Sequence, residues 1–320
     1  MRAVMLDAAS LRPEQLDLAA LYNVEGVDWQ VYESTLPGEI DERIAQAHIV
    51  LTNKVVIGAE AIARAEQLRL ISVMATGTNN IDLAAASKQG IVVCNAQSYS
   101  MPSLMQHTWM LILALAGKVV LMQEQVREGA WQQASQFCLL DHSAVELSGK
   151  VLGVIGFGDS GRAVAAIAEA FGMKVLVAQR PGSEHCPDGR VPLEVLLRES
   201  DVVSIHCPLT EHSAGLIASA ELALMKAGAF IVNTARGGII DECALAEALR
   251  EGEIAGAALD VLSTEPPPAN HPLLAADVPN LILTPHSAWG SIESRQRLVD
   301  QLCAVVEGFV AGNIVQQVNA

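Results

Sequence analysis

The sequence predicts an α/β fold with two domains and a doubly wound parallel sheet. Its 320 residues exceed the size at which a single hydrophobic core usually stops growing, roughly 250 to 300 residues. Apolar residues make up 51% of the chain and charged residues 18%, which excludes intrinsic disorder and allows a large buried core. From residue 151 onward, short apolar runs alternate with helical segments, the pattern of a parallel sheet covered by helices.

The first stretch of the chain reads as a small α/β unit followed by a long helix. Strands are expected at residues 3–6, 48–51, 70–74 and 91–94, separated by Ala- and Glu-rich helical segments. One helix is then expected over residues 102–128, with Pro102 in its first turn and Gly129 as its stop. Its apolar stripe is broader than one core face requires, so we expect a buried or dimer-facing helix that bridges the two domains.

The second stretch repeats strand and helix strictly. Strands are expected at residues 151–155, 174–178, 201–205, 230–233, 255–259 and 281–284, and helices at 163–171, 193–199 and 242–251. Continuous apolar runs of this length indicate strands buried on both faces, hence a parallel, doubly wound sheet. The last helix, residues 291–311, is assigned to the first domain.

Composition excludes several classes of function. The chain carries 20 basic and 36 acidic side chains, a net charge of −16, and no cluster of Lys and Arg, so nucleic-acid binding is not expected. The six cysteines form no C-x-x-C pair and the histidines lack metal-site spacing, so we expect neither disulfides nor a metal. No secretory signal opens the chain, and its most apolar window, residues 109–116, is too short to span a bilayer. We therefore expect a cytoplasmic protein without membrane contact, in which local positive charge must capture any small anionic substrate.

A glycine motif predicts a dinucleotide site. Gly156, Phe157, Gly158, Asp159, Ser160 and Gly161 spell G-x-G-x-x-G between an expected strand and an expected helix. The first glycine makes the tight turn, the second lets backbone approach a pyrophosphate, and the third allows close helix packing. The helix N-terminus then receives the phosphates. The alternative is a tight turn that binds nothing.

The choice of nucleotide stays open. An NAD site usually has an acidic residue about 20 residues after the glycines, but this chain has Gln179 and Arg180 there. Arg180 could pair with the 2′-phosphate of NADP, or it could be a solvated loop residue. His206, Cys207 and Pro208 end a further strand and are expected to line the adenine side, unless Pro208 merely ends the strand.

Polar residues at the expected strand ends predict the chemistry. Arg236 follows a buried strand, and its guanidinium matches a carboxylate with two hydrogen bonds, although it could instead pair with a helix C-terminus. His286 follows another strand and titrates near neutrality, as a proton donor to a reduced carbonyl must. Glu265 is expected to favour its imidazolium form and fix which nitrogen faces the substrate. Asp260 comes at the end of the expected strand 255–259, which lies between Arg236 and His286 in the sequence.

Together the motifs resemble the D-isomer-specific 2-hydroxyacid dehydrogenase family over nearly the whole chain. The motifs are residues 156–161, 206–210, 233–237, 260–266 and 285–286. Residues 76–82, 136–138 and 286–290 are most similar to the branch of bacterial glycerate dehydrogenases, also called hydroxypyruvate reductases. The presence of Glu265 rather than Gln argues against the formate dehydrogenase branch.

The resemblance implies two Rossmann-like domains, with the nucleotide-binding domain inserted into the substrate-binding domain. The substrate-binding domain would be residues 1–98, the NAD(P)-binding domain residues 99–290, and residues 291–320 a C-terminal helix returning to the first domain. Dimers are usual in the family, so a homodimer is expected. The departure at Gln179 and Arg180 leaves both NAD(H) and NADP(H) open as coenzymes.

The resemblance also implies roles for single residues. Arg236 would bind the substrate carboxylate, His286 would donate the proton, and Glu265 would tune His286. Thr76 and Gly77 would offer backbone donors to the carboxylate. The coenzyme contacts would include Leu104 beside the nicotinamide and Asp260 at its carboxamide, with Thr234, Ala235, Arg236, His286 and Ala288 nearby.

The implied reaction is hydride transfer between NAD(P)H and C2 of a small anionic 2-keto acid. Hydroxypyruvate or glyoxylate would be reduced to D-glycerate or glycolate. Two alternatives stay open: a dehydrogenase for another keto acid or of phosphonate type, and a nucleotide-sensing protein like the family's corepressor branch. The fold alone does not decide between an enzyme and a sensor.

Overall fold

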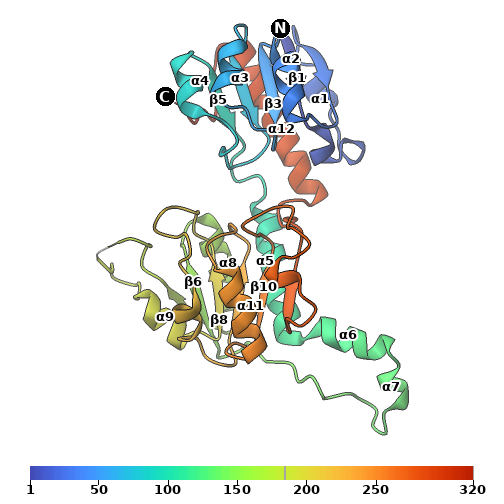
Figure 1. Ribbon diagram of the computed structural model, residues 1–320, viewed down its shortest axis with the longest axis vertical. Helices are drawn as coiled ribbons and strands as arrows, with labels where there is room; N and C mark the ends of the chain where they lie inside the picture. The colour runs from blue at the N-terminus through green and yellow to red at the C-terminus, as the bar shows by residue number, and fades with distance from the viewer. Residues whose placement is uncertain (184, 320) are drawn as a thin grey trace. The chain divides into compact units, whose positions relative to one another are not determined.

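The computed structural model describes residues 1–183 and 185–319, and the chain divides into two compact units. One unit joins Met1–Pro102 with Trp289–Ala320, and the other is Ser103–Ala288, inserted between those two segments. Each unit contains one wholly parallel sheet with helices on its faces (Figure 1). The predicted α/β class, with one Rossmann-like domain inserted into the other, is therefore confirmed.

The first unit has a five-stranded sheet in the order β2-β1-β3-β4-β5. Its strands are β1 Arg2–Met5, β2 Asp28–Val31, β3 Ile49–Thr52, β4 Leu70–Val73 and β5 Val92–Asn95. All neighbouring pairs are parallel. Strand β2 was not predicted, because this edge strand is half-buried or exposed along its whole length and so has no continuous apolar run.

The helices of the first unit cover both faces of that sheet. They are α1 Ala19–Tyr22, α2 Ile40–Ile44, α3 Ala59–Arg64, α4 Leu83–Lys88 and α12 Ile292–Val310. Helix α12 begins at Ser291, whose side chain accepts a hydrogen bond from the Ser294 N–H. Its apolar face, including Leu298 and Leu302, packs into the same core as Met5 of β1, so the C-terminal segment belongs to this unit.

The second unit has a six-stranded sheet in the order β11-β10-β9-β8-β6-β7. Its strands are β6 Val151–Ile155, β7 Lys174–Val177, β8 Val202–Ile205, β9 Phe230–Asn233, β10 Gly256–Leu259 and β11 Leu281–Leu283. The chain starts at β6, adds β7 on one side and β8 on the other, so the strand order reverses next to β6. Ligands of doubly wound folds bind at the carboxyl ends of the strands at such a point.

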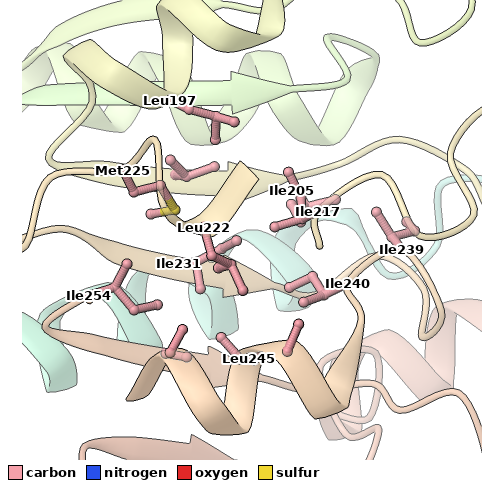
Figure 2. Packing of buried hydrophobic residues seen from close by; sticks show 14 of the residues in the cluster. Leu197, Ile205, Ile217, Leu222, Met225, Ile231, Ile239, Ile240, Leu245 and Ile254 are labelled. Carbon is pink, nitrogen blue, oxygen red and sulfur yellow. The ribbon is translucent and has the colours of Figure 1, made fainter. Parts of the chain in front are cut away.

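Helices bury both faces of the second sheet. The helices of this unit are α5 Met101–Gly117, α6 Val119–Arg127, α7 Ala130–Gln133, α8 Asp159–Ala170, α9 Leu193–Glu199, α10 Ser219–Leu222 and α11 Glu242–Glu251, of which α6 and α7 have no buried residue. Along β9, Ile231 points to one core and Val232 to the other, the alternation expected of a strand covered on both faces. Figure 2 shows the first of these cores, where Ile231 meets Leu222 and Leu245 from the helices.

The single helix expected over residues 102–128 is wrong. It is broken into α5 and α6 at Lys118, which has a left-handed backbone with φ of 48°, and the two parts are bent by 59°. The Ala116 carbonyl accepts a hydrogen bond from the Val145 N–H at 2.8 Å, so a distant segment takes the place of the next helical turn. No single helix among the described residues is both long and apolar enough to cross a membrane, although this bent pair passes that test when its two parts are taken together.

Candidate active site

Three neighbouring strands of the second sheet end in the residues that the sequence singled out. Strands β9, β10 and β11 lie side by side, and they are followed by Arg236, Asp260 and His286 respectively. Since all three strands are parallel, their carboxyl ends meet at one edge of the sheet. The fold therefore places these three residues on the edge where ligands of such sheets bind.

The loop that carries Arg236 is held by the end of its own strand. The Asn233 side chain donates to the Arg236 carbonyl at 2.8 Å and accepts from the Ala235 N–H at 3.0 Å. Gly237 packs so closely on the backbone of Leu262 that a Cβ there would overlap it. The Arg236 side chain is exposed, and among the described residues no carboxylate lies within salt-bridge distance of it. Its guanidinium is thus available to an anionic ligand.

His286 and Glu265 form a close pair. The His286 Nδ1 lies 2.6 Å from the Glu265 Oε2, and the second carboxylate oxygen accepts from the Leu262 N–H at 2.9 Å. Both side chains are about one-third exposed, at 31% and 34%. Because Glu265 engages Nδ1, the other ring nitrogen, Nε2, is the one left for a substrate.

The backbone at His286 is left-handed, with φ of 49°. Such a conformation costs a non-glycine residue roughly 1–3 kcal/mol and persists only where surrounding contacts determine it. Here the His286 N–H donates to the Asp260 carbonyl at 2.8 Å and to the Thr284 carbonyl at 3.0 Å. The end of β10 therefore sets the position of the histidine that follows β11.

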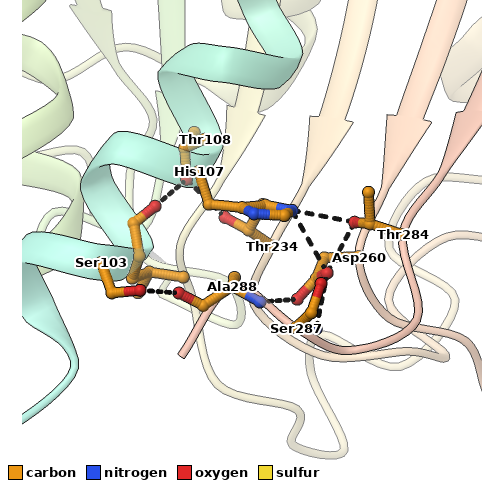
Figure 3. A network of polar contacts seen from close by, with 9 residues as sticks. Ser103, His107, Thr108, Thr234, Asp260, Thr284, Ser287 and Ala288 are labelled. Carbon is orange, nitrogen blue, oxygen red and sulfur yellow. Dashed lines mark hydrogen bonds and ion pairs between the residues drawn. The ribbon is translucent and has the colours of Figure 1, made fainter. Parts of the chain in front are cut away.

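Asp260 is the centre of the buried polar network drawn in Figure 3. One carboxylate oxygen accepts from the Thr284 hydroxyl at 2.6 Å and the Ser287 N–H at 2.9 Å, with the His107 Nε2 at 3.3 Å. The other oxygen accepts from the Ala288 N–H at 2.9 Å. Burial alone would raise the pKa of Asp260, but these hydrogen bonds outweigh it and hold the pKa below its usual range.

The same network ties the broken helix to the strand ends. In Figure 3, His107 and Thr108 reach from α5 toward the sheet, where Thr108 Oγ1 lies 2.8 Å from Thr234 Oγ1. Thr108 also donates to the Leu104 carbonyl at 2.8 Å, and Ser103 donates to the Ala288 carbonyl at 2.7 Å. Leu104, Thr234, Asp260 and Ala288, which the resemblance assigned to the coenzyme, thus belong to one polar network.

The glycine motif forms the turn between β6 and α8. Gly156 has φ of 92° and lies against the backbone of His206 and Cys207, where a side chain would clash. Gly161 lies equally close to the Gly156 carbonyl. At Gly158, by contrast, no atom lies within 4 Å of an added Cβ, and no side chain caps α8 there. The open helix N-terminus is what a pyrophosphate requires.

A groove of about 820 Å³ runs from this turn. Seven of the predicted coenzyme residues line it: Gly156, Phe157, Gly158, Arg180, His206, Cys207 and Pro208. Asp159, Ser160, Gly161 and Gln179 are not among its lining residues. The other lining residues were not predicted as coenzyme contacts. Thr210 ends the 206–210 motif, and the rest come from loops without a motif: Pro181, Ser183, Pro187, Arg190, Glu211, His212 and Ser213.

The charge of the groove comes from two arginines. Arg180 and Arg190 both line it, and Arg190 also donates to the Ala178 carbonyl at 3.0 Å and lies over the Phe157 ring. Burial lowers the pKa of His206 to about 4, so this histidine is neutral at pH 7 and adds no charge. Among the described residues, Glu211 is the one acidic residue on the lining, and its Oε1 lies 3.4 Å from the His212 Nε2.

Thr76 and Gly77 lie in the first unit, in the loop after β4. The Thr76 hydroxyl donates to the Ala96 carbonyl at 2.9 Å, and the Asn95 side chain donates to the Thr76 carbonyl at 2.6 Å. Asn95 is the last residue of β5 and is buried. The Thr76 loop is therefore held by the neighbouring strand, with its carbonyl already engaged.

Comparison with known proteins decides the family. The model for the NAD-binding domain of D-isomer specific 2-hydroxyacid dehydrogenases matches residues 109–288, more than half of the chain. The chain belongs to this family. The second unit is thus the NAD-binding domain of a D-2-hydroxyacid dehydrogenase, and no group of three or more metal-ligating side chains occurs in the part of the chain that the structure describes.

Relatives cover both units of this dehydrogenase. A glycerate dehydrogenase from Methylorubrum extorquens is 44% identical over 293 residues, which cover 90% of this chain and 92% of that protein. A hydroxypyruvate reductase from Blautia hydrogenotrophica is 38% identical over 325 residues and covers 100% of both chains. The solved structure of an acyclic imino acid reductase (Bsp5) in complex with NADPH and D-Arg superimposes with a TM-score of 0.85 at 28% identity, over 99% of this chain and 100% of that chain.

Proposed function

We propose that this dehydrogenase reduces hydroxypyruvate or glyoxylate at C2, giving D-glycerate or glycolate. The observation that carries the proposal is the 2.6 Å pair of His286 and Glu265 at the sheet edge that also presents Arg236. The names of two full-length relatives, glycerate dehydrogenase and hydroxypyruvate reductase, support the choice of substrate.

The residues present fit a dinucleotide coenzyme. The open N-terminus of α8 at Gly158 would hold the pyrophosphate, and the groove beyond it would hold the adenosine half. Asp260 accepts from Thr284, Ser287 and Ala288, and so holds the loop that would border the nicotinamide. When bound, NAD(P)H supplies the hydride.

The protein side chains then divide the remaining work. Arg236 would clamp the substrate carboxylate and polarise the neighbouring ketone. His286 would deliver the proton from Nε2 to the oxygen that becomes the hydroxyl, and Glu265 would hold the ring in that orientation. We also assign a part in substrate binding to the first unit, where Thr76 and Gly77 would offer backbone N–H groups to a carboxylate.

We further propose that NADPH is accepted. The support is electrostatic, since the groove has Arg180 and Arg190 on its lining and Gln179 where an NAD enzyme usually has a carboxylate. Replacing both arginines with Ala should raise the KM for NADPH by about tenfold or more while changing the KM for NADH much less, because only NADPH carries the 2′-phosphate. An equal effect on the two coenzymes would refute this role.

The direct test is steady-state turnover of the purified protein. Oxidation of NADH and of NADPH would be followed with hydroxypyruvate, glyoxylate and pyruvate as separate substrates. Turnover with hydroxypyruvate or glyoxylate well above that with pyruvate is the expected result. Turnover with pyruvate alone, or with no substrate of the three, would refute the proposed reaction.

We also propose a homodimer working in a reducing cytoplasm. Supporting the dimer, residues 119–140 project from the rest of the second unit (Figure 1) and expose Trp131, Phe137 and Leu140 at 53%, 88% and 74%. Supporting the compartment, all six cysteines are free thiols. Light scattering of wild type and of Phe137→Ser with Leu140→Ser should show a dimer in the first case and monomers in the second.

A further inference from the structure

A largely buried carboxylate, Glu242, is the first residue of α11. The helix is capped by Asp241, whose side chain accepts from the N–H groups of Cys243 and Ala244 at 3.0 Å each. The Glu242 side chain, only 11% exposed, is therefore not needed as a cap. It points instead to the segment that follows β10.

Three donors converge on the Glu242 carboxylate. Its Oε1 accepts from the Ser263 N–H at 2.6 Å, and its Oε2 accepts from the Ser263 hydroxyl at 2.6 Å. The His271 Nε2 lies 2.9 Å from Oε2, and its ring is buried. Because the His271 Nδ1 accepts from the Leu273 N–H, the neutral ring carries its proton on Nε2 and donates it to Glu242. Each of these donors needs a carboxylate oxygen opposite it.

The segment that Glu242 holds through Ser263 also carries Glu265, the partner of His286. Ser263 stands two residues before Glu265, and the residue before it, Leu262, donates its N–H to the Glu265 carboxylate at 2.9 Å. On its other side the Leu262 backbone touches Gly237, next to Arg236. One anchored segment thus lies between the loop of the arginine and the carboxylate that meets the histidine.

We propose that Glu242, with Ser263 and His271, is a positioning clamp that sets the tautomer of His286 by fixing the loop of Glu265. The proposal rests on the proposed function for its kinetic consequence but not for its structural one. A displacement of about 1 Å would lengthen the 2.6 Å contact between Glu265 and His286 beyond a good hydrogen bond. The ring would then lose the partner that keeps the proton on Nδ1 and leaves Nε2 facing the substrate.

The main variant is Glu242→Gln, which keeps size and removes the charge. A Gln amide has only one acceptor oxygen, so it cannot serve both the Ser263 N–H and the two donors on the other side. Glu247→Gln is the matched control, since Glu247 is an exposed carboxylate on the same helix. Ser263→Ala removes one hydroxyl from the clamp, and Ser263→Thr restores it at an exposed position.

The first readout needs neither substrate nor coenzyme. Nitrogen chemical shifts of the His286 ring, assigned with the His286→Gln variant, report the tautomer of the neutral ring. Wild type and Glu247→Gln should show mostly the Nδ1–H form, whereas Glu242→Gln should shift toward the Nε2–H form favoured by a free imidazole. An unchanged Nδ1–H fraction in Glu242→Gln would overturn the proposal.

The second readout is kinetic. In Glu242→Gln the kcat for keto-acid reduction should fall by roughly tenfold, a part of the 10²–10⁴ that a placed general acid contributes. The KM for coenzyme should stay within about twofold, and the pH profile of kcat should differ from that of wild type because the ring is no longer held in one orientation. Ser263→Ala should show the same changes more weakly, and Ser263→Thr should recover wild-type values.

The outcomes separate the two proposals. If wild type turns over none of the keto acids, the proposed function fails, and the ring shifts still decide the clamp. If wild type is active and Glu242→Gln keeps its kcat and pH profile, the clamp is refuted and the function stands. If Glu242→Gln does not fold, the serine variants decide. A wild-type kcat in Ser263→Ala refutes the clamp, whereas a lowered kcat that Ser263→Thr restores supports it.

Discussion

Replacing Asp260 with Asn tests the network that holds the histidine loop. The change keeps the shape of the side chain at the end of β10 but leaves one acceptor oxygen where there were two. Wild-type Asp260 accepts from Thr284 and Ser287 on Oδ1 and from Ala288 on Oδ2, all within 2.9 Å. The residue is 2% exposed, so water cannot replace a lost partner.

The magnitude follows from the best arrangement that Asn can adopt. With its oxygen in the place of Oδ1, Asn keeps Thr284 and Ser287, but its amide group then faces the Ala288 N–H, donor against donor. One buried N–H left without an acceptor costs about 1–3 kcal/mol, and the two remaining bonds lose the extra strength of a charged acceptor. We expect a loss of about 3 kcal/mol, which lowers the Tm of a unit of this size by roughly 6–12 °C.

The assay is thermal unfolding at pH 7 without ligands, with Asp141→Asn as control because Asp141 is exposed in a loop of the same unit. The pKa of Asp260 lies below its usual range, so its stabilising effect is full above the unfolded value near 3.9 and disappears as the pH falls through the folded value. The difference in Tm between wild type and Asp260→Asn should therefore become smaller only in strong acid. A variant that melts with the control at pH 7 would refute the reasoning.

Three further predictions test other parts of the site. Arg236→Lys keeps the charge but loses the planar fork, so kcat/KM for the keto acid should fall roughly 10- to 100-fold in steady-state assays, and an unchanged value would exclude a two-bond clamp. Gly158→Ala should raise the KM for coenzyme by about tenfold while the Tm stays within about 1 °C, because a Cβ there meets open space in the protein; a large fall in Tm would contradict this. The pKa of His206 is lowered to about 4, so the folded state resists protonation and stability falls as the pH drops below the unfolded value near 6.5. Wild type should lose about 2 kcal/mol more than His206→Asn between pH 7 and pH 5 in urea unfolding, and equal losses would refute that origin.

The strands could be predicted from the sequence where burial left a continuous apolar run. All six strands of the second sheet lie within a residue or two of their expected bounds, since both faces of that sheet are covered. Strand β2 was missed because its residues, Asp28–Val31, form an edge that is never fully buried. The break at Lys118 was missed because its cause, the Val145 N–H on the Ala116 carbonyl, lies far away in the sequence.

The same division applies to the candidate site. Arg236, Asp260 and His286 could be named because each follows a recognisable strand, and parallel strands bring their ends together. Arg190 and Glu242 could not, since one lies in a loop without a motif and the other looks like an ordinary first-turn carboxylate of a helix. Only the folded chain shows that Arg190 lines the groove and that Glu242 binds Ser263, in the loop that carries Glu265.

Three carboxylates of this acidic chain act as anchors for backbone. Asp260 accepts from the N–H groups of Ser287 and Ala288, Glu242 from that of Ser263, and Glu265 from that of Leu262. Loop N–H groups at the end of a sheet have no strand to pair with, so an inward carboxylate is the acceptor that fixes them. The left-handed backbone of His286 costs roughly 1–3 kcal/mol, and contacts on both sides of the residue must offset this strain. Loosening the Glu242 or the Glu265 anchor should therefore disturb the orientation of the histidine before it disturbs the fold, which is why the ring tautomer is a sharper test of these two residues than stability alone.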